Sequence, residues 1–432
     1  MPESKQGLLK HPVILSFLAV IASVEFIRMS LFLTLLPSFL TSLGFGTVAI
    51  GLVMSANLLT DNLFKGATGW LVDHKGPWPV LFAGSIAVFG GLLLIESFHR
   101  QLWVMTLAAV LLGLGASPTW PATIAGSIRI AGEEKRATMI SFISVIWLAG
   151  GGLGPVLMGF LIDTRLRGML QQVHLPLIDA YRTGFFLLTT IALMAIAAAC
   201  LGWLGWKRLP HLQPVAGEAA PKPRRSIKGA LRRLWEVKGL IPGMFFQTLS
   251  LGILIPNLLP FAVNKIGISE AQYSMVLLIG GLVVVLCMIP VGHLADHWGT
   301  KGFLVSGFAL AAASLLVLVR YGDSRNIWWM VGFVGLSYAL IQPAWNALLA
   351  GAIPPEHRGV LMGLFMSVEG LGFGVGPLAG GILGQIRVNM GGFFQWSGLE
   401  TPFYVSGVCL TIMALVYLFY PFHQYQLRDE TS

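Results

Sequence analysis

Twelve stretches of the chain are apolar over a length that can cross a lipid bilayer. A spanning helix needs about 20 mainly apolar residues, and 55% of this sequence is hydrophobic while only 11% is charged. Backbone groups in hydrocarbon must be satisfied inside the chain, which leaves very few folds open. We therefore predict an all-α membrane protein with twelve transmembrane helices over residues 12–40, 47–72, 78–98, 102–131, 137–163, 181–206, 238–264, 270–294, 299–320, 326–351, 357–385 and 400–421.

The distribution of Lys and Arg predicts how the chain is oriented. With both termini in the cytoplasm, nineteen basic residues fall inside and eight fall outside, and nine of the nineteen lie between Lys207 and Lys238. Cytoplasmic loops carry the excess of Lys and Arg in membrane proteins. This topology explains the net charge of +9 without any nucleic-acid partner. The first apolar run is too long for a cleavable signal and contains charges, so we expect none.

Short motifs recur at a spacing of 222 or 223 residues. They are Gly69, Asp73 and Gly76 with Gly292, Asp296 and Gly299, then Arg136 with Arg358, and Gly154-Pro155 with Gly376-Pro377. A duplication of six spans explains this spacing. We predict an N-terminal six-helix bundle over residues 1–206 and a C-terminal one over 238–432. A cytoplasmic linker over 207–237 joins them and contains a short basic amphipathic helix. Two related bundles around a site near the membrane midplane are typical of secondary transporters.

Three ionisable residues lie near the middle of the first two spans. Glu25 and Arg28 are three residues apart, so they share one face of a helix and can neutralise each other. Asp61 lies in the second span, with Lys65 one turn further along. A charge at the centre of a span costs roughly 2.5–3.5 kcal/mol, and such residues usually line a transport pathway. Two plainer interpretations stay open: a static Glu25–Arg28 pair that fixes the first helix, and a simple Asp61–Lys65 pair.

The repeated GxLxDxxG motif resembles the loop between helices 2 and 3 of the major facilitator superfamily. The glycine-rich run around Gly154-Pro155 resembles the helix 5 motif of proton-coupled exporters in that superfamily, and Gly376-Pro377 is its counterpart. The resemblance implies the major facilitator fold and assigns the repeated motifs, with Arg136 and Arg358, to the gates. The glycines have an alternative role, which is close helix packing and nothing more.

Several separated stretches further resemble the proton-coupled glycolipid flippases of lipoteichoic-acid synthesis in Gram-positive bacteria. They are 25–28, Asp61, 112–120, 240–247, 342–346 and 370–377. This resemblance implies that Glu25, Arg28 and Asp61 serve proton coupling and headgroup binding. It also implies that Trp120 and Trp147 line the substrate cavity, although both could serve packing alone. Further cavity candidates in the second half are Gln342, Trp345, Asn346 and Glu369, of which Glu369 could merely hydrogen-bond across the bundle.

The function implied by the resemblance is a proton-coupled flippase in the cell membrane. It would move a diacylglycerol-linked glycolipid between leaflets by alternating access. The intramembrane charges gather in the first half, whereas runs such as 279–289 and 304–319 are almost wholly apolar. A polar wall facing an apolar one suits an amphiphile. A proton-coupled multidrug antiporter would use the same residues and remains an alternative. A non-transporting sensor or scaffold is disfavoured, because both gate motifs are intact.

No enzyme chemistry is expected of this chain. The sequence places no nucleophile–base pair or metal-ligand spacing at membrane depth, and it has no phosphate-binding loop. The three cysteines fall in separate apolar spans, where they behave as small hydrophobes. We therefore expect no cofactor and no metal. The expected partners are a lipid or glycolipid substrate, protons and membrane lipids, and a monomer suffices for the fold.

The orientation can be tested with single cysteines introduced into a variant that lacks the three native ones. A cysteine within 265–270 should react with an impermeant maleimide from outside the cell, and one within 207–237 only from the cytoplasm. Reaction of both from the same side would contradict the proposed topology.

Overall fold

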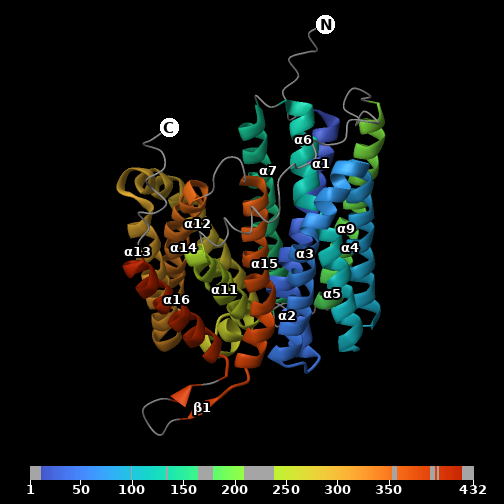
Figure 1. The fold of residues 1–432 in the computed structure, drawn as a ribbon. Coiled ribbons are helices and arrows are strands. Elements are labelled where there is room, and N and C mark those ends of the chain that lie inside the picture. Colours follow the sequence, from blue (N-terminus) through green and yellow to red (C-terminus); the bar gives the residue numbers. More distant parts are fainter. Residues whose placement is uncertain are drawn as a thin grey trace, which may run out of the picture. The chain divides into compact units, whose positions relative to one another are not determined.

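The computed structural model describes residues 11–98, 100–132, 135–163, 179–208, 238–352, 358–389, 395–396 and 398–420. Within these ranges, twelve helical segments are long and apolar enough to cross a membrane. The prediction of an all-α protein with twelve spans is confirmed, and Figure 1 shows the helices along the chain. The predicted amphipathic helix of the linker lies outside the described residues.

The contacts divide the chain into two compact units, of which unit 1 comprises Met1–Leu43 and Val53–Arg224. The helix α3 begins in unit 2, with its residues up to Leu52, and continues in unit 1. The elements of this half are α1 (Pro12–Ser30), the π-helical turn η2 (Leu31–Leu35), α2 (Leu36–Ser42), α3 (Thr47–Lys75), α4 (Pro77–Phe98), α5 (Leu102–Ala116), α6 (Thr119–Ala131), α7 (Arg136–Ile162) and α9 (Ala180–Lys207).

Unit 2 comprises Gly44–Leu52 and Arg225–Ser432. Its helical elements are the 3₁₀ turn η5 (Lys238–Leu240), α11 (Ile241–Phe261), the π-helical turn η6 (Ala262–Ile266), α12 (Glu270–Trp298), α13 (Thr300–Tyr321), α14 (Ile327–Ala352), α15 (Arg358–Leu383) and α16 (Thr401–Phe419). Between α15 and α16, the strands β1 (Val388–Asn389) and β2 (Gln395–Trp396) pair antiparallel, which the sequence did not predict.

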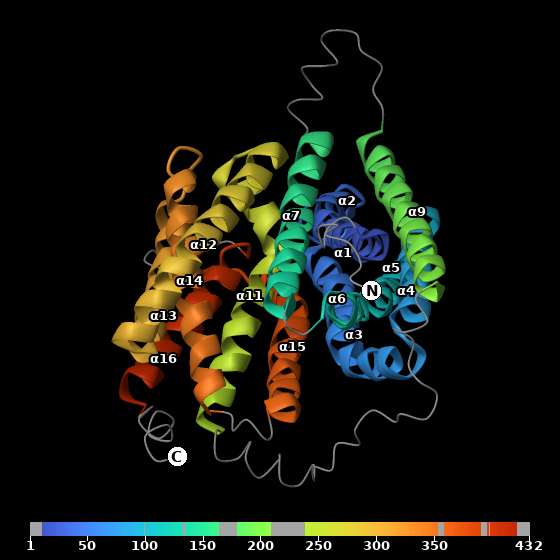
Figure 2. The ribbon, with the colours of Figure 1, turned by 90° about the horizontal axis from the view of Figure 1, so that it is seen from above.

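The same helix pairs pack together in both units. In unit 1, α1 packs against α7, and α4 packs against α5 and α9. In unit 2, α11 packs against α15, and α13 packs against α14 and α16. Figure 2 shows these neighbours from above. The internal repeat seen in the sequence is therefore a repeat of structure, as expected of two six-helix pseudo-repeats. The exact boundaries proposed for the bundles and the linker stay a prediction.

Two glycines of the repeated motif close equivalent turns. Gly76 has φ of 83° between α3 and α4, and Gly299 has φ of 88° between α12 and α13. A left-handed conformation costs a residue with a Cβ atom roughly 1–2 kcal/mol, whereas glycine adopts it freely. Each turn is closed by a backbone bond, from Gly76 N–H to the Val72 carbonyl (2.9 Å) and from Gly299 N–H to the Ala295 carbonyl (3.0 Å).

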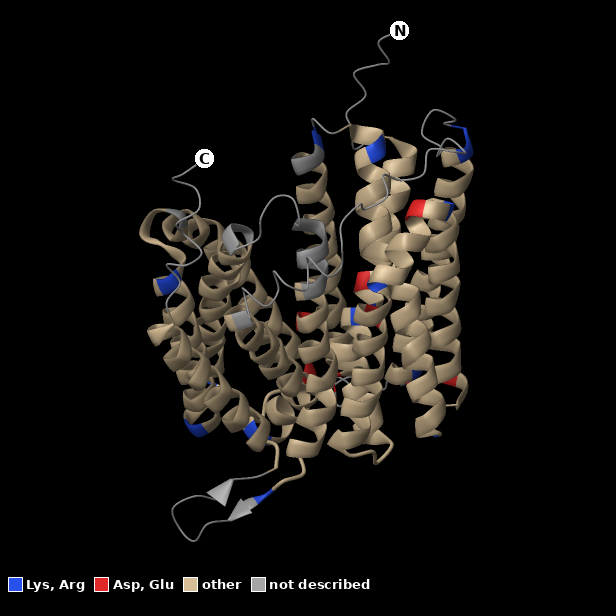
Figure 3. Cartoon of the chain, viewed as in Figure 1, with Lys and Arg blue, Asp and Glu red and all other residues tan. Residues whose placement is uncertain are grey.

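Charged side chains are scarce along the helices, and most lie near helix ends, as Figure 3 shows. The outer surfaces instead expose large apolar side chains such as Phe186, Leu286 and Phe419. In water such surfaces would be costly, but hydrocarbon solvates them without penalty. The few charges at mid-helix are therefore the residues that require a functional or structural reason.

The first and fourth spans are interrupted close to these charges. The π-helical turn η2 follows α1 directly after Ser30, and such turns are common at functional sites. The fourth span breaks between α5 and α6 at Ser117 and Pro118, where the Ser117 hydroxyl donates to the Leu114 carbonyl (2.9 Å). Trp120 lies in the first turn after this break.

Candidate functional site

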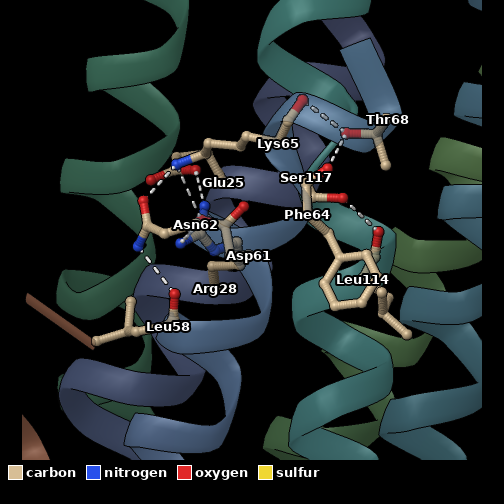
Figure 4. Close-up of polar contacts among 10 residues, drawn as sticks. All are labelled: Glu25, Arg28, Leu58, Asp61, Asn62, Phe64, Lys65, Thr68, Leu114 and Ser117. Atoms are coloured by element: carbon tan, nitrogen blue, oxygen red, sulfur yellow. Dashed lines mark hydrogen bonds and ion pairs between the residues drawn. The ribbon is translucent and has the colours of Figure 1, made fainter. Parts of the chain in front are cut away.

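The three predicted charged residues meet in unit 1 (Figure 4). Arg28 Nη1 lies 3.4 Å from Glu25 Oε2, one turn earlier on α1, as their spacing predicts. Arg28 Nη2 donates to Asp61 Oδ2 on α3 at 3.0 Å. One guanidinium therefore joins the two carboxylates, and its planar set of N–H donors is suited to such a bridge.

Lys65 is a fourth member of this cluster. Its Nζ lies 3.2 Å from Asp61 Oδ2 and donates to Asn62 Oδ1 at 3.0 Å. Lys65 and Arg28 thus share one oxygen of Asp61. The spacing of Asp61 and Lys65 on one helix had suggested this pair as the plainer interpretation. The structure shows that this pairing and the Arg28 pairing exist together. We call Glu25, Arg28, Asp61 and Lys65 the charged cluster.

The charged cluster has two acids and two bases, so its formal charges cancel. The side chains of Glu25 and Asp61 are only 5% and 2% exposed, whereas that of Lys65 is 38% exposed. Removing one partner from a buried pair leaves an uncompensated charge, which typically costs 3–5 kcal/mol. The two acids and the two bases can therefore be buried together only because their charges cancel.

Some polar atoms of the cluster remain unsatisfied. Glu25 Oε1, Asp61 Oδ1 and Arg28 Nε are buried and have no hydrogen-bond partner among the described residues. A buried acceptor without a donor loses roughly 1–3 kcal/mol relative to water. Glu25 Oε1 and Asp61 Oδ1 could each accept a further hydrogen bond, and Arg28 Nε could donate one.

Both predicted tryptophans adjoin the cluster within unit 1. The Trp147 side chain on α7 lies beside the Glu25 carboxylate. Its ring meets that of Trp120 on α6 edge to face, with centroids 5.9 Å apart and an interplanar angle of 69°. Aromatic pairs favour this geometry over face-to-face stacking. The five site residues predicted for the first half are thus linked, with Glu25 joining the charges to the aromatic pair.

The glycines of α7 make this arrangement possible. A Cβ atom on Gly154 would lie 2.7 Å from the Phe26 carbonyl oxygen of α1 and would also overlap Ser30 Oγ. One on Gly150 would lie 2.8 Å from the Ala22 carbonyl oxygen. The motif therefore acts through close packing, which brings the Trp147 helix onto the Glu25 face of α1. In unit 2, Gly376 on α15 packs against Gly252 on α11 in the same way.

The second-half candidates all belong to unit 2. Trp345 is fully buried on α14, and its indole Nε1 donates to Glu369 Oε1 on α15 at 3.2 Å. The suggested hydrogen bond of Glu369 across the bundle therefore exists. Gln342 is half-buried and Asn346 is exposed.

The gate motifs are described only in part. Asp73 is exposed at the end of α3, and a Cβ atom on Gly69 would meet no neighbour. The side chains of Arg136, Asp296 and Arg358 lie outside the described part of the structure. Their gate role stays a prediction. Among the described residues, no group of three or more His, Cys, Asp and Glu could hold a metal ion.

Comparison with known proteins places the chain in a family. The model of the Major Facilitator Superfamily matches residues 18–241 and 240–430. The chain belongs to this superfamily and is a multi-pass membrane transporter. Its sequence is 25% identical over 414 residues to the proton-coupled antiporter flippase LtaA of Staphylococcus aureus strain MSSA476, with 94% of each chain covered. The same protein of strain USA300 matches to the same extent. The resemblance inferred from the sequence is confirmed.

Solved structures agree on the fold. A bacterial homologue of the human lysosomal transporter Spinster, inward-facing and occupied, has a TM-score of 0.72 at 16% identity. The match covers 97% of this chain and 98% of that one. The nucleoside transporter NupG has a TM-score of 0.68 at 17% identity, covering 95% and 100%. These similarities establish the fold. They say nothing about the charged cluster, whose role is inferred from its own contacts.

The packing role of Gly154 gives a testable prediction. Gly154→Ala should lower the melting temperature of the detergent-purified protein, because overpacking typically costs 1–3 kcal/mol and both neighbours on α1 are close. Gly152→Ala is the matched control, since a Cβ atom there meets nothing within 4 Å. Scanning fluorimetry measures both. Equal melting temperatures for the two variants would contradict the assigned role.

Proposed function

We propose that the chain is a proton-driven flippase that moves a diacylglycerol-linked glycolipid between leaflets by alternating access. The charged cluster takes the coupling proton and binds the sugar headgroup. Three kinds of observation support the proposal: the mid-membrane cluster, its aromatic neighbours, and the similarity along 94% of the chain to a protein named as a proton-coupled antiporter flippase.

The observation that carries the proposal is the pair of unsatisfied oxygens, Glu25 Oε1 and Asp61 Oδ1. Each can accept a proton, and each can equally accept a hydrogen bond from a sugar hydroxyl. Both ligands would occupy the same oxygens, so they would exclude one another. Mutual exclusion of proton and substrate is what an antiporter requires. Since these atoms are buried in the described state, a conformational change must open them to either ligand.

Protonation would also rearrange the cations. Asp61 Oδ2 holds both Arg28 and Lys65 as long as it is charged. A proton on Asp61 removes that attraction and leaves Arg28 with Glu25 as its remaining anionic partner. Lys65, the most exposed member, would then turn toward the aqueous path. The cluster would hence have two arrangements, and the proton would select between them.

The surroundings suit a sugar linked to a lipid. Trp120 and Trp147 offer flat apolar faces for the C–H side of a sugar ring, and the carboxylates and Arg28 serve its hydroxyls. Apolar runs of the second half, such as residues 279–289 and 304–319, suit contact with acyl chains instead. In the proposed setting, the protein lies in the cell membrane with both termini in the cytoplasm. A monomer contains every group that the proposal uses.

Removal of either acid should abolish coupling. In proteoliposomes with a fluorescent diacylglycerol disaccharide, Glu25→Gln and Asp61→Asn should each reduce pH-gradient-driven flipping to the level of protein-free vesicles. Each variant keeps the side-chain shape and loses the proton acceptor. Each variant also leaves one cation of the cluster uncompensated, so size-exclusion chromatography should first show monodisperse protein, and only then is a loss of flipping assigned to the missing proton acceptor.

Asp323→Asn provides the matched control for these variants. Asp323 lies outside the spans, where the N–H groups of Asn326 and Arg325 each donate to its carboxylate at 2.8 Å. These bonds lower the pKa of Asp323, so it stays ionised near neutral pH and takes no part in coupling. Full coupling in both cluster variants would refute the assignment of the proton site.

The aromatic pair should determine preference for sugar. Trp120→Ala should weaken binding of the disaccharide lipid about tenfold, since one stacking face on a ring contributes on the order of 1–2 kcal/mol. Binding of a lipid without sugar should be unchanged. Trp103→Ala is the control, because Trp103 is 68% exposed on the outside of α5. A protein that exports cationic drugs and ignores disaccharide lipids would be a multidrug antiporter, and the flippase proposal would fail.

A further inference from the structure

Unit 2 contains one acid whose setting differs from that of the charged cluster. Glu369 lies near the middle of α15, and the only hydrogen bond recorded for its carboxylate among the described residues comes from the Trp345 indole (3.2 Å). The ion pairs between described side chains do not include Glu369. Glu25 and Asp61 are matched by two cations, whereas Glu369 is matched by a neutral donor.

The internal repeat shows which residues correspond to this acid and its surroundings. An offset of 222 residues places Glu369 at the position of Trp147, and Gln247 at the position of Glu25. The glycine contacts support this register, because Gly154 meets Ser30 and Gly376 meets Gly252 at the same offset. The acid therefore lies on the first helix of the pair in unit 1 and on the second in unit 2. Ser250 stands at the position of Arg28, so unit 2 has no cation there.

Among the described residues of unit 2, the elements packed around Glu369 offer it no compensating charge. Neither α11 nor the first turns of α3 up to Leu52 contain a titratable residue. The titratable groups of α16 are Tyr404, Cys409 and Tyr417, and α14 contributes the Tyr338 phenol. On α15 itself the other charged residue is Arg358, eleven residues away, or about 16 Å along a helix. These neighbours supply no cation next to the carboxylate.

A small cavity in unit 2 has a volume of about 70 Å³ and an almost wholly apolar lining. Its lining residues include Gln247, Ser250, Ser337 and Tyr338. Gln247 Oε1 and Ser250 Oγ are buried without a hydrogen-bond partner among the described residues. These groups are neutral, so they supply no cation for the carboxylate of Glu369.

We propose that Glu369 is a second proton site, protonated in the state described here and deprotonated at another stage of the transport cycle. An uncompensated carboxylate at the centre of a span is costly, and a proton is the one counter-ion that needs no additional space. The step is a transfer from hydronium to the carboxylate, which yields water and a neutral carboxyl group. Its role in the cycle rests on the proposed proton-driven transport.

Infrared difference spectroscopy on the purified full-length protein tests the protonated state directly. At neutral pH, the spectrum should contain a carboxylic C=O stretching band that disappears in Glu369→Gln. The band should persist in Asp323→Asn, whose carboxylate is ionised. In Trp345→Phe it should shift to higher frequency, because the indole no longer donates to the carboxyl group. If Glu369→Gln removes ionised carboxylate absorbance and leaves the C=O band, the proposal is wrong.

A second measurement tests whether the proton is exchanged. The number of protons moved per lipid, obtained from the pH gradient that just halts flipping, should fall by one in Glu369→Gln. An unchanged number would overturn the proposal even with the band present. This result is separable from failure of the charged cluster, because Glu25→Gln abolishes coupling altogether and leaves the Glu369 band in place.

Discussion

The bridge that Arg28 forms between Glu25 and Asp61 is the interaction on which the rest of unit 1 depends. Arg28 lies on α1 and reaches one acid on its own helix and another on α3. Without Arg28, the carboxylates of Glu25 and Asp61 would be buried close together, and burying even one uncompensated charge is energetically costly. The glycines of α7 serve the same site, since they let that helix approach α1 and place Trp147 beside Glu25. Glu25 is thus contacted both by its ion-pair partner Arg28 and by Trp147 of the closely packed helix α7.

Much of this arrangement could be predicted from the sequence. Span lengths follow from apolar runs, and the repeat follows from motif spacing, so twelve helices in two related halves could be expected. The Glu25–Arg28 contact follows from their separation along one helix. The sharing of Asp61 Oδ2 by Arg28 and Lys65 could not be predicted in this way. It depends on how α3 is rotated about its own axis relative to α1. The Asp61–Lys65 contact was raised from their spacing, but only as an alternative to the contact with Arg28.

Trp345 shows a second limit of the sequence. In a soluble protein, polar residues mark the outer face of a helix, and periodicity separates core from surface. In a membrane bundle both the core and the lipid-facing surface are apolar, so the pattern does not tell which way a tryptophan points. Trp345 was predicted to line a cavity, and it lies in the core of unit 2 with its N–H directed to Glu369. In the sequence, the one hint of this hydrogen bond is the presence of Glu369 on the neighbouring helix α15.

The two units resolve the same electrostatic difficulty in different ways. Unit 1 buries four charges whose sum is zero, and its proposed proton upsets that balance and so alters the cluster. In unit 2, Ser250 stands at the position that corresponds to Arg28, and Glu369 lies on the neighbouring helix with an indole donor in place of a cation. The two units thus differ in what balances a mid-helix acid: cations in unit 1 and, in our proposal, a proton in unit 2.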